Sequence, residues 1–209
     1  MPTLLHISAS PLHEGSFSSR IADAFLASWR ESNPGGTVDT INLWTEQLPA
    51  FDAEGATWKL KTMAGVAPSP EDAAVYARIR GVADRFLAAD KYLISCPMWN
   101  FSVPYTLKHY IDVLVQPGLT YGFDPAKGFF GLVPDRPVQL VLTRGGSYAP
   151  GQQLAHLEFQ RSYLEGVLGF IGLTDTRAIV MECTGYGPAV SDPLLAQASA
   201  EAAVAGQTF

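Results

Sequence analysis

Short apolar runs alternate along the whole chain with longer segments of helical periodicity. Five segments have the length and composition of β-strands, and they are residues 4–7, 37–43, 91–96, 137–143 and 176–181. Between them, apolar residues recur every three or four positions, which predicts amphipathic helices. The helices are expected from residue 17 to the Asn33-Pro34-Gly35-Gly36 stop and over residues 71–89, 105–115, 152–169 and 192–205.

The alternation of strands and helices predicts one α/β domain over residues 1–209, with a parallel sheet covered by helices on both faces. Five strands indicate the flavodoxin-like variant of the doubly wound fold. Two segments lie outside the pattern: residues 44–70 are expected to be rich in loops, and residues 117–134 form an excursion rich in Gly and aromatic residues. Ligands bind such folds beyond the carboxyl ends of the strands. The loops after the first, third and fourth strands are therefore the candidate site.

Composition narrows the class of protein. Charged residues make up 16% of the chain, against roughly 25% in an average soluble protein, and the net charge is −6. An acidic chain without a basic patch is not expected to bind nucleic acid or an anionic membrane. Cys96 and Cys183 form no CxxC motif, and no apolar run reaches the roughly 20 residues of a membrane span. We expect a soluble cytoplasmic protein without a metal site.

The loop after the first strand holds five serines and leads into a helix. Ser16 is the expected N-cap of that helix, as Ser69-Pro70-Glu71 is the expected start of the helix over 71–89. Free backbone N–H groups and the helix dipole make such an N-terminus a phosphate site, to which the hydroxyls add donors. The loop lacks the GxxxxGK[ST] and GxGxxG motifs. A serine-rich cap without any ligand is the alternative interpretation.

The other two loops suit a flat ring. The loop over residues 97–104 carries Met98, Trp99, Asn100 and Phe101, which offer apolar walls and one amide for the edge of a heterocycle. Ordinary core packing of the two aromatic residues is the alternative. The loop over 143–148 carries a Gly-Gly pair that lets the backbone approach a ligand closely. Together, the three loops describe a site for a flat ring with a phosphate tail, which is the shape of FMN.

At these residues the chain resembles the FMN-dependent NADH-azoreductases, whose relatives include NAD(P)H:quinone oxidoreductases. The resemblance is carried by Ser10 with SFS at 16–18, PMWNFSVPYTLKHYID at 97–112, TRGG at 143–146 and LGFIGLTD at 168–175. It implies that the FMN phosphate is held by Ser10, Ser16, Phe17 and Ser18. It implies that the isoalloxazine ring is held by Met98, Trp99, Asn100, Phe101, Thr143, Arg144, Gly145 and Gly146. Tyr148 stands where many members have His, so no catalytic side chain is assigned.

The resemblance also implies the reaction. Hydride would pass from NADH or NADPH to flavin N5 and then to a quinone or an aromatic azo compound, in a ping-pong mechanism. Tyr121 and Phe123, within the aromatic segment 119–130, are the expected substrate contacts. A homodimer is expected, with its interface near residues 101–123 and 160–172. One alternative is a flavodoxin-like electron carrier. The other is a phosphodiesterase-type hydrolase, which would need an activated nucleophile or a metal site, and the sequence shows neither.

The remaining candidate residues are expected to be structural. His6 lies in the first strand and is expected in the core, while His13 is expected to be a solvated loop residue. His109 and Asp112 are one helical turn apart but lack a third metal ligand. Cys96 ends an apolar strand and has no base beside it, so packing is favoured over nucleophilic chemistry.

Overall fold

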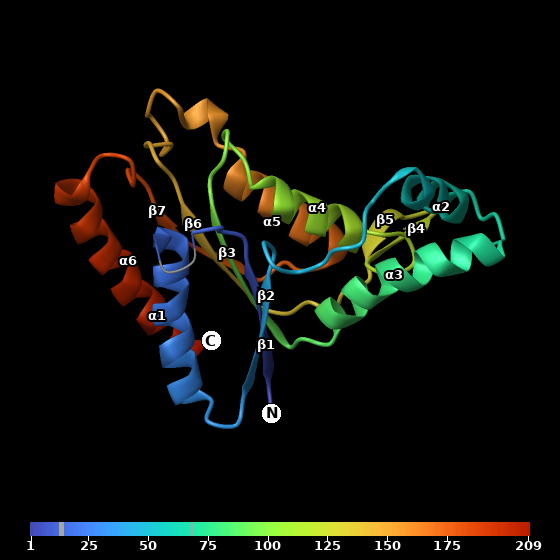
Figure 1. Cartoon of the computed structure of the whole chain (residues 1–209), viewed down its shortest axis with the longest axis horizontal. Helices are drawn as coiled ribbons and strands as arrows, with labels where there is room; N and C mark the ends of the chain where they lie inside the picture. Colours follow the sequence, from blue (N-terminus) through green and yellow to red (C-terminus); the bar gives the residue numbers. More distant parts are fainter. Residues whose placement is uncertain (13–14, 68) are drawn as a thin grey trace.

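The computed structural model describes residues 1–12, 15–67 and 69–209. Its centre is a five-stranded parallel sheet in the order β2-β1-β3-β6-β7 (Figure 1). The strands are β1 Thr3–Ser8, β2 Thr37–Asn42, β3 Lys91–Pro97, β6 Val138–Thr143 and β7 Thr176–Met181. Each lies where the apolar runs predicted a strand, and the flavodoxin-like α/β fold is confirmed.

Helices cover both faces of the sheet, because side chains of a strand alternate between its two sides. Leu4 faces α1 (Phe17–Ser32) and α6 (Pro188–Thr208), together with residues of β3, β6 and β7. Leu5 faces the opposite side, where the core includes residues of α3 (Pro70–Leu87), α4 (Tyr105–Leu114) and α5 (Gln160–Ile171). The predicted start of α3 is confirmed, because Ser69 forms a capping box there.

The loop-rich prediction for residues 44–70 was wrong in its middle, where α2 spans Ala53–Met63. Asp52 caps this helix by accepting hydrogen bonds from the backbone N–H groups of Glu54 and Gly55, both at 3.1 Å. The helix buries only Gly55 and Trp58, so its apolar stripe is too short to give a periodic signal.

Three other boundaries differ from the prediction. The excursion at 117–134 contains an antiparallel hairpin of β4 (Tyr121–Asp124) and β5 (Gly128–Gly131). The helix expected from residue 152 begins at residue 160, after a short 3-10 helix, η2, over Ala155–Leu157. The helix expected from residue 192 begins at residue 188 and continues through Pro193. Pro193 is the sixth residue of this helix, so it removes the one backbone hydrogen bond that would run to the oxygen of Ala189.

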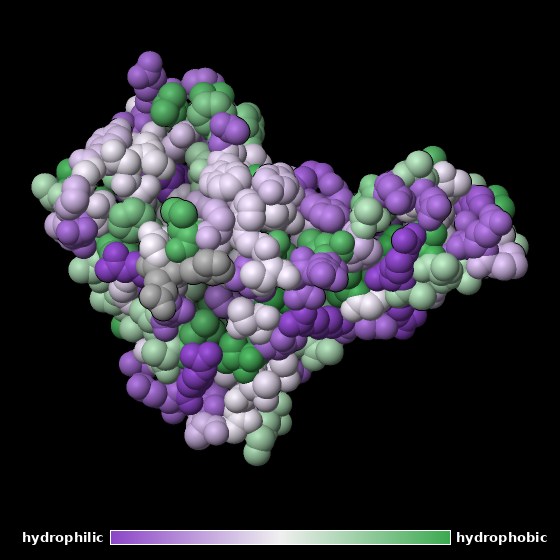
Figure 2. Space-filling model, viewed as in Figure 1, coloured by the Kyte–Doolittle hydropathy of each residue, from purple (hydrophilic) through white to green (hydrophobic). Residues whose placement is uncertain are grey.

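The α2–α3 pair and the β4–β5 hairpin form a lobe that projects from the body of the molecule (Figure 1). Apolar residues reach the surface where this lobe meets the body (Figure 2). Within the described residues, no helix combines the length and the hydropathy needed to cross a bilayer. No group of three metal-ligating side chains gathers in that same part of the chain.

Candidate functional site

The three candidate loops follow strands that are neighbours in the sheet. β1 pairs with β3, and β3 pairs with β6, all in parallel. Beyond the ladders, Ala9 N donates to Ser95 O at 2.9 Å and Met98 N donates to Thr143 O at 2.7 Å. The topology therefore brings the serine loop, the Met98–Phe101 segment and the TRGG segment to one edge of the sheet.

The serine loop presents an open helix N-terminus. Ser10, Ser16 and Ser18 are buried, and the Ser16 and Ser18 hydroxyls lie 3.0 Å apart. Ser16 has the extended backbone of an N-cap, but its side chain makes no hydrogen bond to the helix backbone, and the first turn of α1 has no acidic residue. The first N–H groups of a helix have no intrahelical acceptor, so those of α1 are available to an anion. Phe17 packs against the α1–α6 core, and His13 lies outside the described residues.

The loop after β3 makes a tight turn in an uncommon conformation. Trp99 and Ser102 exchange two backbone hydrogen bonds of 2.9 and 3.0 Å. Asn100 and Phe101 between them have positive φ values of 46° and 74°. The left-handed region costs a non-glycine residue about 1–2 kcal/mol, and such strain gathers at functional sites. The turn leaves the side chains of Asn100 and Phe101 exposed.

An aromatic wall of three rings stands beside this turn, and the sequence identified only Trp99 among them as a site residue. The ring of Trp44 lies 5.5 Å from that of Trp99 and 5.4 Å from that of Tyr105. Trp44 Nε1 donates to the backbone oxygen of Ala9 at 3.0 Å, which joins the wall to the serine loop. Trp44 closely follows β2, the strand next to β1. Its position at a fourth strand end was the signal that could have identified it.

A cavity of about 460 Å³ adjoins the wall. Its lining residues combine rings, one amide and several ionisable groups, and are Phe51, Trp99, Asn100, Val103, Tyr105, Lys108, His109 and Asp112. Lys108 Nζ lies 2.6 Å from Asp112 Oδ1, and His109 Nε2 lies 2.9 Å from the backbone oxygen of Pro49. These contacts give His109 and Asp112 structural partners.

The TRGG segment turns its carbonyl groups away from the loops after β1 and β3. The oxygens of Arg144, Gly145 and Gly146 accept hydrogen bonds of 3.0–3.1 Å from backbone N–H groups in the loop after β7. Among residues 1–12, 15–67 and 69–209, the N–H groups of Gly145 and Gly146 find no acceptor. Apart from Gly145 and its two chain neighbours, no described residue comes within 4 Å of a Cβ built on Gly145. These two amides are therefore open to a ligand.

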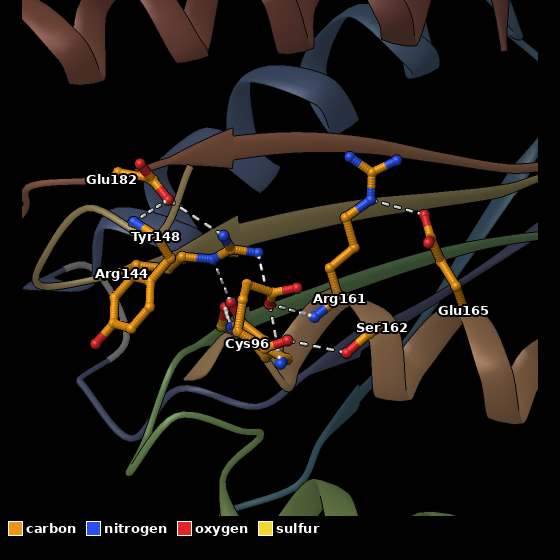
Figure 3. A network of polar contacts seen from close by, with 9 residues as sticks. Cys96, Arg144, Tyr148, Arg161, Ser162, Glu165 and Glu182 are labelled. Atoms are coloured by element: carbon orange, nitrogen blue, oxygen red, sulfur yellow. Dashed lines mark hydrogen bonds and ion pairs between the residues drawn. The ribbon is translucent and has the colours of Figure 1, made fainter. Parts of the chain in front are cut away.

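The side chain of Arg144 points away from these amides. Its guanidinium is buried between the carboxylates of Glu158 and Glu182, at 2.8 and 3.2 Å (Figure 3). Thr143 is also buried, at the end of β6. The ring of Tyr148 lies 6.4 Å from that of Phe101, at an interplanar angle of 65°. The structure thus places Tyr148 beside the strained turn.

The two expected substrate contacts lie elsewhere, on the β4–β5 hairpin. Tyr121 is buried against the ring of Phe170 at 4.9 Å, and Phe123 lies 5.0 Å from the ring of Phe129. Lys59 Nζ lies 5.8 Å from the rings of both Tyr121 and Phe51. Phe51 also lines the 460 Å³ cavity, whose lining includes neither Tyr121 nor Phe123.

Two further predictions from the sequence are confirmed. His6 is buried, with its Nε2 2.9 Å from Ser95 Oγ. Burial raises the pKa of the Cys96 thiol to about 12, so this cysteine stays protonated near neutral pH. The burial of Cys96 favours packing over nucleophilic chemistry, as the sequence indicated.

The sheet order, with ligand-accessible loops beyond β1, β3 and β6, defines the flavodoxin-like class of α/β proteins. Residues 2–205 match the protein family described as having a flavodoxin-like fold. The chain belongs to this family, and within it to the FMN-dependent NADH:quinone oxidoreductases and azoreductases.

Relatives of two kinds support this assignment. The FMN-dependent NADH:quinone oxidoreductase of Nitratidesulfovibrio vulgaris is 42% identical over 187 residues, which is 90% of this chain and 89% of the relative. That of Desulfotalea psychrophila is 38% identical over 202 residues, covering 97% and 95%. Among solved structures, a Bacillus anthracis azoreductase aligns over 100% of both chains with a TM-score of 0.89 and 30% identity. A second B. anthracis protein, an FMN-dependent NADH-azoreductase in complex with FMN, has a TM-score of 0.87 and 25% identity, covering 100% of this chain and 99% of the other.

Proposed function

We propose that this protein is an FMN-dependent oxidoreductase that transfers hydride from NADH to quinones and aromatic azo compounds. The observation that carries the proposal is the pair of amides at Gly145 and Gly146, which have no acceptor among the described residues and lie beyond the strand adjacent to the Asn100 turn. The names of the relatives at 38–42% identity support NADH, FMN and quinones, and the names of the related azoreductase structures support azo acceptors.

The described residues fit FMN at both ends of the molecule. The open N-terminus of α1 with Ser10, Ser16 and Ser18 would hold the phosphate. Asn100 can both donate to and accept from the polar edge of the ring, and Trp99 supplies an apolar wall. When bound, FMN accepts a hydride and passes it to a second substrate. The amides of Gly145 and Gly146 would donate to negative charge that develops at the ring, and this preorganised donation needs no side-chain acid.

Both substrates would use the same open face in turn, which gives ping-pong kinetics. The 460 Å³ cavity beside Trp99 and Tyr105 offers apolar walls for a flat acceptor. The test is initial-rate kinetics of the FMN-loaded protein with NADH and menadione or an azo dye varied together. Parallel lines in double-reciprocal plots are expected. Intersecting lines contradict the ping-pong order, and bound FMN that NADH does not reduce favours an electron carrier instead.

The same proposal includes a homodimer in the cytoplasm, with NADPH as the alternative donor to NADH. Exposed aromatic side chains support the dimer: Phe101 is 39%, Phe123 61% and Phe129 55% accessible, and apolar groups of this kind mark contact surfaces. The free thiols of Cys96 and Cys183 suit a reducing compartment. The net charge of −6 favours small-molecule substrates over nucleic acid or anionic membranes. Light scattering that gives one chain mass of 22.5 kDa instead of twice that mass contradicts the dimer.

A further inference from the structure

The guanidinium of Arg144 lies in a network of polar contacts, and Figure 3 shows it beside Glu182 and Tyr148. Arg144 lies at the end of β6, and its side chain is 5% accessible. It donates to Glu158 at 2.8 Å, to Glu182 at 3.2 Å and to Gln160 Oε1 at 3.1 Å. Gln160 in turn donates to the backbone oxygen of Cys96 at 3.1 Å. The ends of β6, β7 and β3 and the start of α5 therefore share one network.

Glu182 fixes the far end of the TRGG loop. It accepts a hydrogen bond from Ser147 Oγ and another from Tyr148 N, both at 2.8 Å. The guanidinium carbon of Arg144 lies 6.0 Å from the centre of the Tyr148 ring, within the range of a cation–π contact. The two open amides, at Gly145 and Gly146, therefore lie between Arg144 and Ser147, and Glu182 bonds to both of these residues.

Glu158 connects the network to the strained turn at Asn100 and Phe101. It accepts from the backbone N–H groups of Gln160 and Arg161 at 3.0 and 2.8 Å, so its carboxylate caps α5. Phe159, which lies between Glu158 and Gln160, donates its N–H to the backbone oxygen of Phe101 at 3.0 Å. The backbone of Phe101 is therefore bonded to the N-terminus of α5, which Glu158 caps, and Arg144 pairs with the carboxylate of Glu158.

We propose that Arg144, with Glu158 and Glu182, is a positioning element that couples the TRGG loop to the Asn100 turn and so sets the affinity for FMN. The proposal rests on the proposed function for its ligand. Stability alone is a weak reason for such a network, because buried ion pairs are often replaceable by apolar residues without loss of stability. The network instead joins the two loops that would face opposite edges of one ring.

Glu182→Ala is the variant that tests the coupling. The change leaves Arg144 paired with Glu158, so no buried charge is left alone. Asp175→Ala is the matched control, because Asp175 precedes β7 as Glu182 follows it, and its exposed pair with Arg177 lies at the other end of the strand.

Two measurements are made on each variant. Hydrogen exchange of the protein without FMN is expected to become faster in Glu182→Ala at residues 144–148 and also at residues 98–103, which Glu182 does not contact. FMN binding is expected to weaken by about tenfold, as for the loss of a hydrogen bond to a charged group. Asp175→Ala is expected to change neither quantity.

Glu182→Gln supplies the rescue, because its amide oxygen can still accept from Tyr148 N. Partial recovery of both measurements supports the proposal, and it holds the test open if Glu182→Ala fails to fold. Faster exchange confined to 144–148, or an FMN dissociation constant within twofold of the wild type, overturns the coupling. A wild-type protein that binds no FMN overturns the proposed function, whereas exchange at 98–103 still decides whether the loops are coupled.

Discussion

The left-handed backbone of Phe101 makes a quantitative prediction. Its φ of 74° costs any residue with a Cβ about 1–2 kcal/mol, and glycine avoids this cost. Glycine also loses more conformational freedom on folding, which costs about 0.5–1 kcal/mol relative to alanine. Phe101→Gly is therefore expected to be more stable than Phe101→Ala by about 0.5–1 kcal/mol. Both variants lose the ring contact with Tyr148, so the difference isolates the backbone.

Urea unfolding at equilibrium, followed by circular dichroism, measures this difference. Ala77→Gly is the control, because Ala77 is exposed on the right-handed helix α3. There the sign reverses, and glycine is expected to lose about 1 kcal/mol relative to alanine. If Phe101→Ala proves as stable as Phe101→Gly, the turn stores no strain, and its conformation is no evidence for a functional site.

Three other predictions concern packing, pH and capping. Gly206→Ala in α6 would place a Cβ 2.3 Å from the backbone oxygen of Phe25 and is expected to lower the free energy of unfolding by about 1–3 kcal/mol. Gly81→Ala meets open space and is expected to raise it by about 0.5–1 kcal/mol. Thermal midpoints that shift in the same direction for both variants would contradict this prediction. Burial lowers the pKa of His6 from 6.5 to about 4. The unfolded chain therefore takes up the proton first, and about 3 kcal/mol of stability is lost as pH falls through that window. His6→Gln is expected to flatten this pH dependence in urea titrations, and an unchanged slope refutes it. Ser69→Ala removes the cap of α3 and is expected to cost about 1 kcal/mol of unfolding free energy; no measurable loss would show that the cap is dispensable.

The elements that were predictable from the sequence are those whose hydrophobic pattern is long or unbroken. The five strands are continuous apolar or alternating runs, and their order along the chain determines which three loops meet. α2 was missed because Trp58 is the one large side chain that it buries. The start of α5 was misplaced because Glu158, rather than a residue with N-cap propensity, satisfies its first amides.

Parts of the candidate site depend on contacts that leave no local signal. Asn100 suits the left-handed region, but Phe101 beside it does not, so turn chemistry did not predict a turn with two left-handed residues. The direction of the Arg144 side chain is determined by carboxylates 14 and 38 residues away along the chain. Residues so far apart become neighbours only when the sheet is complete.

The central claim is that the serine loop and the two ring loops together hold FMN. Titration of the protein without cofactor, with FMN and with riboflavin, tests it most directly, because riboflavin lacks only the phosphate. Tight binding of FMN and a clearly weaker binding of riboflavin are expected, with Ser18→Ala narrowing the gap between them. Equal affinities for the two flavins, or binding of neither, would contradict the account.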